Sequence, residues 1–464
     1  MIPTSHRKKD MMMMMFVSVS IIASLLPLWL GPSFWFLPAV EAGRAPQKKF
    51  PLPIVPYDEN SNSFSNSVGV GDDEALASLL QELDSFVSDA VSYLVRISHT
   101  AEQDPKFPGR FTYQADIRTK LDPRSNYWRH HEQPDYNLLR HNGAIYALSQ
   151  AYHRNEERRK INHNDASSLD ANQIAIQHTM ELAVGYLRDN ALLPVPGHKD
   201  EWLAAWERID PEDPHSEPDT ANLGGAGLAM IALGKLEEIK PHSVSHEHEL
   251  RKLGAFVESL QNKENGSFTC KYKWGIGPYD ECLSLYYSGE AALGLVTLAE
   301  LELKIEEEEE RSQRKMVTSA ELELEHQHHT TGHSGSSSSG SSTDGTNKEN
   351  YSQRWIKVAK NALLYLEQLR RDQDLEEIEP DHWALLATAR LLPILDQQKL
   401  DLANGSFNQK QAALEYSLIY AHGVRVAYSM VSDHTTEGLS KHGGCFTYDA
   451  RTCATATRLE GLSE

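Results

Sequence analysis

Four carboxyl-bearing residues lie near the starts of predicted helices and could carry acid–base chemistry: Asp219, Glu290, Asp381 and Glu460. A pair of carboxyl groups can cleave a glycosidic bond when one is protonated and the other is ionised. Asp219 and Asp381 each follow a proline and precede helical sequence, so N-capping is an alternative role for both. Their spacing along the chain does not select a pair, and we keep all four as candidate catalytic residues.

The elements that would position these residues are helices. Apolar residues recur at helical spacing, whereas strand-like alternation is nearly absent, so we expect an all-α fold. The predicted helical segments are 74–98, 136–154, 170–188, 219–238, 245–262, 284–303, 353–370, 381–395, 409–431 and 454–464.

Every second segment opens with small residues, as in TANLGGAGLAMIALGKL at 220–236. Glycine inside a helix lowers its stability, so this recurrence favours an inner layer in which helices pack closely. The intervening segments are amphipathic and fit an outer layer.

This alternation, with the motifs YNLLRHNG, YYSGEA, DHW and TATRLEG, resembles an uncharacterised branch of the six-hairpin glycosidase-like proteins. Sugar epimerases, terpene cyclases and lanthionine cyclases share that α/α toroid. QNKENGSF, from Gln261 to Phe268, is similar to a turn of terpene cyclase repeats and indicates a junction between hairpins. The resemblance implies an (α/α)6-like toroid over 73–464. A complete six-hairpin ring needs a further hairpin, so we expect five hairpins or a ring incomplete at its C-terminus.

In such a toroid the inner helices share one direction, and their N-terminal ends surround one funnel where a ligand binds. The resemblance therefore implies a set of substrate-binding candidates at these ends: Tyr136, Arg140, His141, Tyr287, His382, Trp383 and Arg458. Arg140 could instead form a structural ion pair with Glu290 or Glu460, or it could clamp a sugar hydroxyl or a uronate carboxylate.

Two further chemistries use residues of the same region. Epimerisation or elimination at a uronic acid would need a base and a cation beside the acidic carbon. Its candidates are Tyr136, Tyr286, Tyr287, His141, His382 and Arg458. Sugar rings could stack on Trp202, Trp206, Trp274 and Trp383, although aromatic residues of helical proteins also form core.

The N-terminus predicts export. Four basic or histidine residues at 6–9 precede an almost uncharged stretch at 11–40, typical of a signal peptide or a signal anchor in residues 1–42. Positive charge before the apolar run places the rest of the chain in the lumen or outside the cell. Residues 43–72 read as a disordered stalk, and residues 306–350 as a low-complexity insert in the toroid domain 73–464.

Cysteines and sequons agree with export. Cys270 and Cys282 lie close in sequence, as do Cys445 and Cys453, so each pair could form a local disulfide in an oxidising compartment. Glycosylation candidates are Asn265, Asn350 and Asn404.

The composition limits the function. A formal charge of −21 argues against a nucleic-acid partner. The sequence holds no nucleotide-binding glycine motif, nucleophile elbow or HExxH, and we expect no cofactor or metal. We therefore expect a secretory-pathway protein with a carbohydrate ligand, most concretely a glycoside hydrolase-like enzyme. A non-catalytic glycan- or protein-binding toroid, a uronate lyase or epimerase, and an isoprenoid cyclase relative remain as alternatives.

Overall fold

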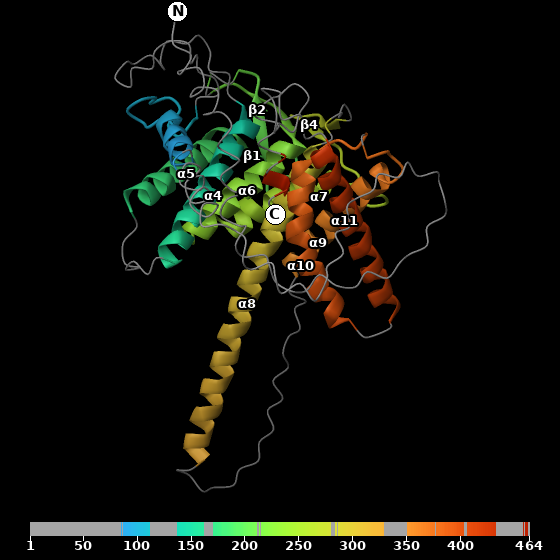
Figure 1. Ribbon diagram of the computed structural model, residues 1–464. Coiled ribbons are helices and arrows are strands. Elements are labelled where there is room, and N and C mark those ends of the chain that lie inside the picture. Colours follow the sequence, from blue (N-terminus) through green and yellow to red (C-terminus); the bar gives the residue numbers. More distant parts are fainter. Residues whose placement is uncertain are drawn as a thin grey trace, which may run out of the picture.

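The computed structural model shows a mostly helical protein (Figure 1). It describes residues 85, 87–111, 137–161, 170–210, 213, 215–279, 284, 286–328, 350–375, 377–402, 406–432, 458 and 460–462. The labelled helices are α4 (Leu138–Ile161), α5 (Ala171–Asn190), α6 (Leu223–Ile239), η2 (His246–Leu250), α7 (Arg251–Ser259), α8 (Tyr287–His328), α9 (Tyr351–Arg370), α10 (His382–Asp401) and α11 (Phe407–Ser432). Residues 87–97 are also helical.

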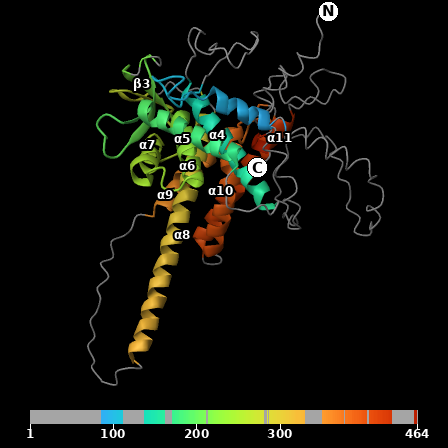
Figure 2. The same ribbon diagram turned by 90° about the vertical axis from the view of Figure 1, so that its left-hand side faces the viewer.

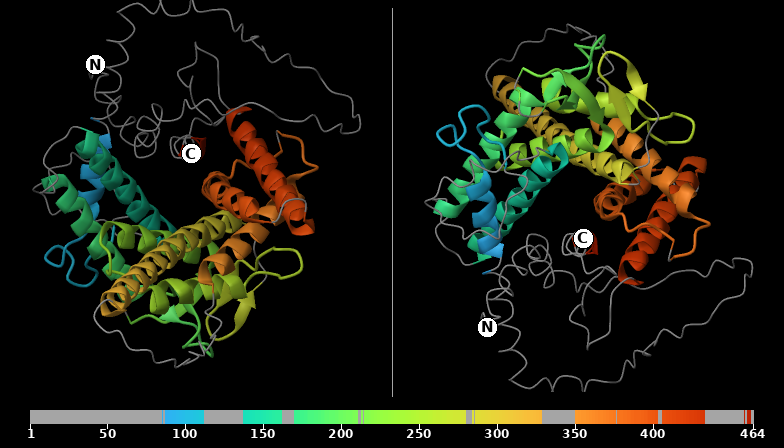
Figure 3. Two further views of the ribbon diagram at one scale, coloured as in Figure 1. Left: turned by 90° about the horizontal axis from the view of Figure 1, so that it is seen from below. Right: turned by 90° about the horizontal axis from the view of Figure 1, so that it is seen from above.

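The helices form two layers along an arc, which is visible when the molecule is viewed along the helices (Figure 3). In the inner layer α6 packs between α4 and α8, and α8 packs against α10. Helices α5, α7, α9 and α11 lie on the outside, each against its inner neighbours. The predicted alternation of inner and outer helices is therefore present among the described residues.

The inner helices run parallel to one another. Along α6 and α8, Gly224 lies beside Glu290, and Gly234 lies farther along beside Thr297. On the α4 side, the Asn142 side chain reaches the carbonyl of Gly225 at 3.5 Å. On the α10 side, Gly289 lies against Asp381 and Ala384. Because these contacts advance in the same order, the N-terminal ends of all four helices lie at one end of the molecule.

Close packing of α6 on α8 depends on glycine. A Cβ atom at Gly227 would lie 2.4 Å from the carbonyl oxygen of Glu290, and one at Gly294 would lie 2.5 Å from that of Gly227. Both obstacles are backbone atoms, which cannot turn aside as a side chain can. The small residues thus set the short distance between these two helices, as the sequence predicted.

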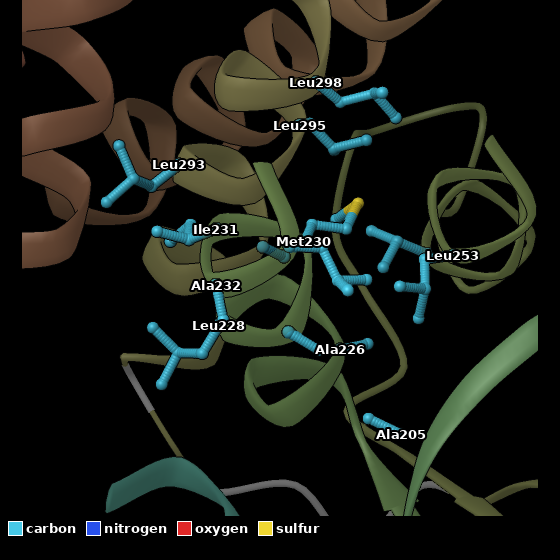
Figure 4. Close-up of a cluster of buried hydrophobic side chains, with 14 of the residues drawn as sticks. Ala205, Ala226, Leu228, Met230, Ile231, Ala232, Leu253, Leu293, Leu295 and Leu298 are labelled. Atoms are coloured by element: carbon cyan, nitrogen blue, oxygen red, sulfur yellow. The ribbon is translucent and has the colours of Figure 1, made fainter. Parts of the chain in front are cut away.

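The core between α6, α8 and α7 is apolar (Figure 4). Met230 of α6 faces Leu253 of α7 on the side where Leu295 and Leu298 of α8 lie, whereas Ile231 points to the opposite side of α6. All five side chains are fully buried. Burying such side chains is the main source of favourable free energy for this packing.

A small antiparallel sheet, which the sequence did not predict, precedes and follows α6. Its strands pair in chain order: β1 (Leu192–Pro194), β2 (Leu203–Arg208), β3 (Pro218–Asn222), β4 (Lys271–Lys273) and β5 (Gly277–Tyr279). Since β3 leads directly into α6, the sheet stands at the N-terminal end of the inner layer. The predicted helix at 219–238 therefore begins later, at Leu223.

Helix α8 is the longest element and leaves the helical body toward its C-terminal end (Figure 2). It continues to His328, so it includes the first part of the segment 306–350. Exposed pairs one helical turn apart, such as Glu307 with Arg311, lie along the projecting part. Within the described residues, no helix combines the length and the apolar character needed to cross a membrane.

Several predicted features lie outside the described residues. These are the targeting segment 1–42, the stalk 43–72, Tyr136, Cys282, Cys445, Cys453 and Asn404.

Candidate functional site

Glu290 is a buried residue in the first turn of α8, at the end of the molecule where the inner helices begin. Its side chain is 6% exposed, and its Oε2 atom has no hydrogen-bond partner among the described residues. It lies against Gly224 of α6, where a Cβ atom would stand only 1.8 Å from Oε2. A glycine at this position of α6 therefore makes the space that the carboxyl group occupies.

The environment of Glu290 favours its protonated form. Burial raises the pKa of this carboxyl group to about 8, and the negative charge of Asp381 adds to the shift. Arg140 of α4 acts in the opposite direction but does not cancel it. A carboxylic acid that keeps its proton near neutral pH can donate it to a leaving group.

Glu207 on β2 is a second acid of this region that the sequence pattern did not indicate. Its Oε1 atom accepts a hydrogen bond of 2.9 Å from the side-chain amide of Asn222, the residue that precedes α6. Burial and nearby Asp219 raise the pKa of Glu207, whereas the Asn222 bond and Lys271 of β4 lower it. The surrounding sequence LAAWER shows neither the alternation of apolar and polar residues typical of a strand nor a helix-start signal.

Tyr287 lies near enough to both Glu207 and Glu290 for their charges to act on it. It is the first residue of α8, and its ring lies against Gly224. Burial raises the pKa of its phenol, and the charges of Glu290 and Glu207 raise it further. Burial and the charges of both carboxyl groups therefore keep the Tyr287 hydroxyl in its neutral, protonated form.

Asp381 is engaged in structural contacts. As the N-cap of α10, it accepts a 3.0 Å hydrogen bond from the Ala384 amide, which confirms the capping interpretation. Its other oxygen pairs with Arg370 at 3.1 Å, and Arg370 in turn contacts His422 at 3.3 Å. Burial raises the pKa of Asp381, and Arg370 opposes this shift. The side chain is fully buried, so it reaches a ligand only if this network opens.

Asp219 does not cap a helix. It lies in β3, and its carboxylate pairs with Lys273 of β4 at 2.6 Å; this bond lowers its pKa. The N-cap of α6 is Asn222, so the capping interpretation is wrong for Asp219. The strand takes precedence here because residues 220–222 pair with Lys271–Lys273 in the sheet.

The second tyrosine at this end, Tyr286, points to different partners. Its hydroxyl donates to Glu379 at 3.1 Å, and burial together with Glu379 raises its pKa to about 12. Arg458 lowers that pKa and therefore lies near the same hydroxyl. Arg458 and Glu460 are both buried. Tyr286 and Tyr287 thus divide the start of α8 into two sides, one toward α10 and one toward α6.

The histidines of the predicted set are core residues. His141 faces the outer layer, with its Nε2 atom 2.9 Å from the Ala183 carbonyl and its ring beside Tyr186. Burial lowers its pKa to about 4. The ring of His382 lies tilted beside that of Trp383, with centroids 4.3 Å apart, and burial lowers the pKa of His382 to about 3. Both imidazoles are therefore neutral at physiological pH, and His141 does not join Glu290.

Of the tryptophans, Trp206 is buried, whereas Trp202 and Trp274 are partly buried. Trp206 is buried, and its indole N–H donates to the Leu193 carbonyl at 3.0 Å. Trp274 is partly buried and meets Trp206 edge to face at 4.7 Å. Trp202 stacks on His198, with centroids 3.7 Å apart. The partly buried Trp274 belongs to the turn after β4, beside the strand that carries Lys271.

Other predicted features have clear structural roles. Cys270 is disulfide-bonded. The Gln261 side chain donates to the carbonyl groups of Gly266 and Val358, so this turn joins the end of α7 to α9. Asn265 is exposed in the turn, whereas Asn350 caps α9.

Comparison with known proteins gives no family for this chain: it matches no protein-family model and no curated protein. Within the parts of the chain that the structure describes, no three His, Cys, Asp or Glu side chains are grouped to hold a metal ion.

Proposed function

We propose that this protein is a carbohydrate-active protein of the secretory pathway, built as an α/α toroid and acting as a glycoside hydrolase-like enzyme. The observation that carries the proposal is the Glu290 carboxyl group, which is buried and partly unpartnered at the shared N-terminal end of the inner helices. Keeping such a group in a folded core has a free-energy cost, which a catalytic role would explain.

The reaction would begin at the oxygen of a glycosidic bond. Glu290 donates its proton to this oxygen as the bond to the anomeric carbon breaks, so that the leaving sugar departs as a neutral alcohol. Arg140 and Tyr287 lie near Glu290 and would contact hydroxyl groups of the bound sugar. The parallel inner helices direct the positive ends of their dipoles to the same end of the molecule, which suits a polar ligand.

Export is part of the proposal. The disulfide at Cys270 supports folding in an oxidising compartment. Together with the basic and apolar N-terminal sequence, it favours a lumenal or extracellular location, either secreted or anchored.

A non-catalytic glycan-binding toroid is the second candidate. It is favoured by the engagement of Asp381 with Arg370 and of Asp219 with Lys273, which leaves two of the predicted acids in structural pairs. Binding would then occur without bond cleavage.

One experiment separates the two candidates. The purified protein is applied to a glycan array, and each glycan that binds is incubated with it and analysed for cleavage by mass spectrometry. We expect cleavage that falls by about 10²- to 10⁴-fold in Glu290→Gln. The exposed Glu308→Gln on the same helix is the matched control and should cleave normally. Binding without cleavage would establish the second candidate, and neither binding nor cleavage of any glycan would refute both.

A further inference from the structure

Two carboxyl groups lie at the start of α6, beside residues that are only two positions apart. Asn222 binds Glu207 through its side-chain amide. Gly224 makes room for Glu290, whose Oε2 atom lies where a Cβ atom would be. One short segment therefore positions an acid from β2 and an acid from α8.

The backbone of β2 is irregular at this acid. The pairing of β2 with β3 shifts register between Glu207 and Arg208, because Glu207 lies opposite Thr220 while Arg208 lies opposite Pro218. Such bulges redirect side chains and are frequent beside active sites. The irregularity occurs at Glu207 itself.

Glu207 also differs from the other acids of this end in its partner. Its hydrogen bond comes from a neutral amide, whereas Asp219 and Asp381 accept from the cations Lys273 and Arg370. A carboxylate without a bonded cation retains more of its basicity. Among these three, Glu207 is therefore the best suited to accept a proton.

We propose that Glu207 is the catalytic base of the site and works with Glu290 as its acid, with Tyr287 near both. The inference rests on the glycoside hydrolase-like function proposed above and names its second carboxyl group. As Glu290 protonates the leaving oxygen, a water molecule attacks the anomeric carbon and Glu207 takes the proton that this water loses. The products are a sugar with a free anomeric hydroxyl and the released alcohol. Proton exchange with solvent then returns both acids to their starting forms.

The pH profile of kcat/KM distinguishes this role from a structural one. Glu207 faces Lys271 and Asp219 from the neighbouring strands and Tyr287 from α8, and Glu290 faces Asp381 and Arg140. If Glu207 is the base, its ionisation sets the acidic limb of the profile, and that of Glu290 sets the alkaline limb.

The decisive variants are Glu207→Gln and Glu207→Asp, assayed on the glycan that the wild-type protein cleaves. We expect Glu207→Gln to lower kcat by about 10²- to 10⁴-fold and to abolish the acidic limb, with KM nearly unchanged. Glu207→Asp, which keeps a carboxylate, should retain some activity and the acidic limb. Glu201→Gln, an exposed acid before β2, is the matched control and should behave as wild type.

The outcomes separate this inference from the proposed function. Absence of cleavage by the wild-type protein would refute the proposed function and the role of Glu207 with it. Cleavage that depends on Glu290 but persists, with its acidic limb, in Glu207→Gln would refute only the role of Glu207. If circular dichroism shows that Glu207→Gln does not fold, the pH profile of Glu207→Asp decides. A lower kcat with unchanged KM and an unchanged acidic limb supports Glu207 as the base. An unchanged kcat overturns that role.

Discussion

Both ends of the inner helices contain buried or partly buried charged groups. The two ends differ in whether every buried acid has a bonded partner. Toward the C-terminal ends, Lys235 pairs with Glu238 at 2.7 Å in the last turns of α6, and Arg390 in the middle of α10 pairs with Glu300 of α8. Lys304 adds a second cation to Glu238 at 3.2 Å. At the N-terminal ends, Glu290 is buried beside another acid, and one of its oxygens lacks a partner among the described residues.

This difference separates a structural role from a functional one. Paired charges at the C-terminal ends link α6, α8 and α10 without leaving a charge unsatisfied. An acid that is buried without such a partner lowers stability, so its presence at the other end calls for a different explanation.

The largest effect should come from breaking a pair at the C-terminal ends. Arg390→Ala leaves Glu300 without its cation and removes a hydrogen bond of 3.1 Å to Thr297. We expect the free energy of unfolding, measured with urea, to fall by about 3 kcal/mol. Arg311→Ala, which breaks an exposed pair on α8, should change it by less than about 0.5 kcal/mol. Equal effects of the two variants would contradict a stabilising role for this end.

Removing the buried acid should instead relieve a pH-dependent loss of stability. The pKa of Glu290 rises from 4.5 to about 8 on folding, so the folded state holds a proton that the unfolded state releases. The contribution of Glu290 to stability is therefore greatest below pH 4.5 and falls as the pH rises toward 8. In Glu290→Gln this component of the decline disappears, and the stability of the variant relative to wild type should rise by about 3 kcal/mol between pH 4.5 and pH 7.

Urea unfolding at a series of pH values measures this difference, with Glu308→Gln on the exposed part of α8 as the control. Parallel stability curves for wild type and Glu290→Gln would show that the carboxyl group has an ordinary pKa in the folded protein. The N-terminal end would then resemble the C-terminal end.

A smaller effect is expected from the glycine contact that holds α6 and α8 together between these ends. In Gly227→Ala the new methyl group meets the backbone of Glu290 and Ala291, so the helices must separate. We expect a loss of about 2 kcal/mol of stability and a displaced Glu290. Thermal unfolding measures the first effect, and glycan cleavage reports on the second. Unchanged stability would mean that the two helices have room to move apart.

The smallest effect should have the opposite sign. Gly143 lies in α4, and nothing stands within 4 Å of a Cβ atom built there. Gly143→Ala should raise the free energy of unfolding by about 0.5–1 kcal/mol, because alanine favours the helix. It is also the matched control for Gly227→Ala in the same unfolding experiment. A loss of stability at both positions would indicate that the packing argument for Gly227 is wrong.

The helices could be predicted because their signal is local. Periodic apolar residues indicated every inner and outer helix that the structure describes, and the glycines of α6 indicated close packing. The sheet could not be predicted in the same way. Its strands are short, β2 begins with four buried residues instead of alternating ones, and β5 contains Gly277 and Pro278.

The candidate site was predictable only in part. Glu290 was identified because it opens a helix, which periodicity reveals. Glu207 was not identified, because its position beside α6 depends on the sheet and on a hydrogen bond from Asn222. These are contacts between residues distant in sequence, which a local pattern does not reveal. His141 was placed at the rim by its position in α4, but its side chain turns toward Ala183 in the outer layer. Sequence periodicity predicts that a helix is present more reliably than it predicts which neighbour a given side chain faces.

The parallel inner layer also has a consequence for how the chain folds. Helices α4, α6, α8 and α10 each pack against the next inner helix in chain order, and each outer helix packs against inner helices close to it in sequence. Contacts of this kind close short loops and favour rapid folding. As in repeat proteins, structure can form at one helical pair and spread to its neighbour. We therefore expect the α4–α6 part to assemble while the chain is still being synthesised, before α10 has emerged.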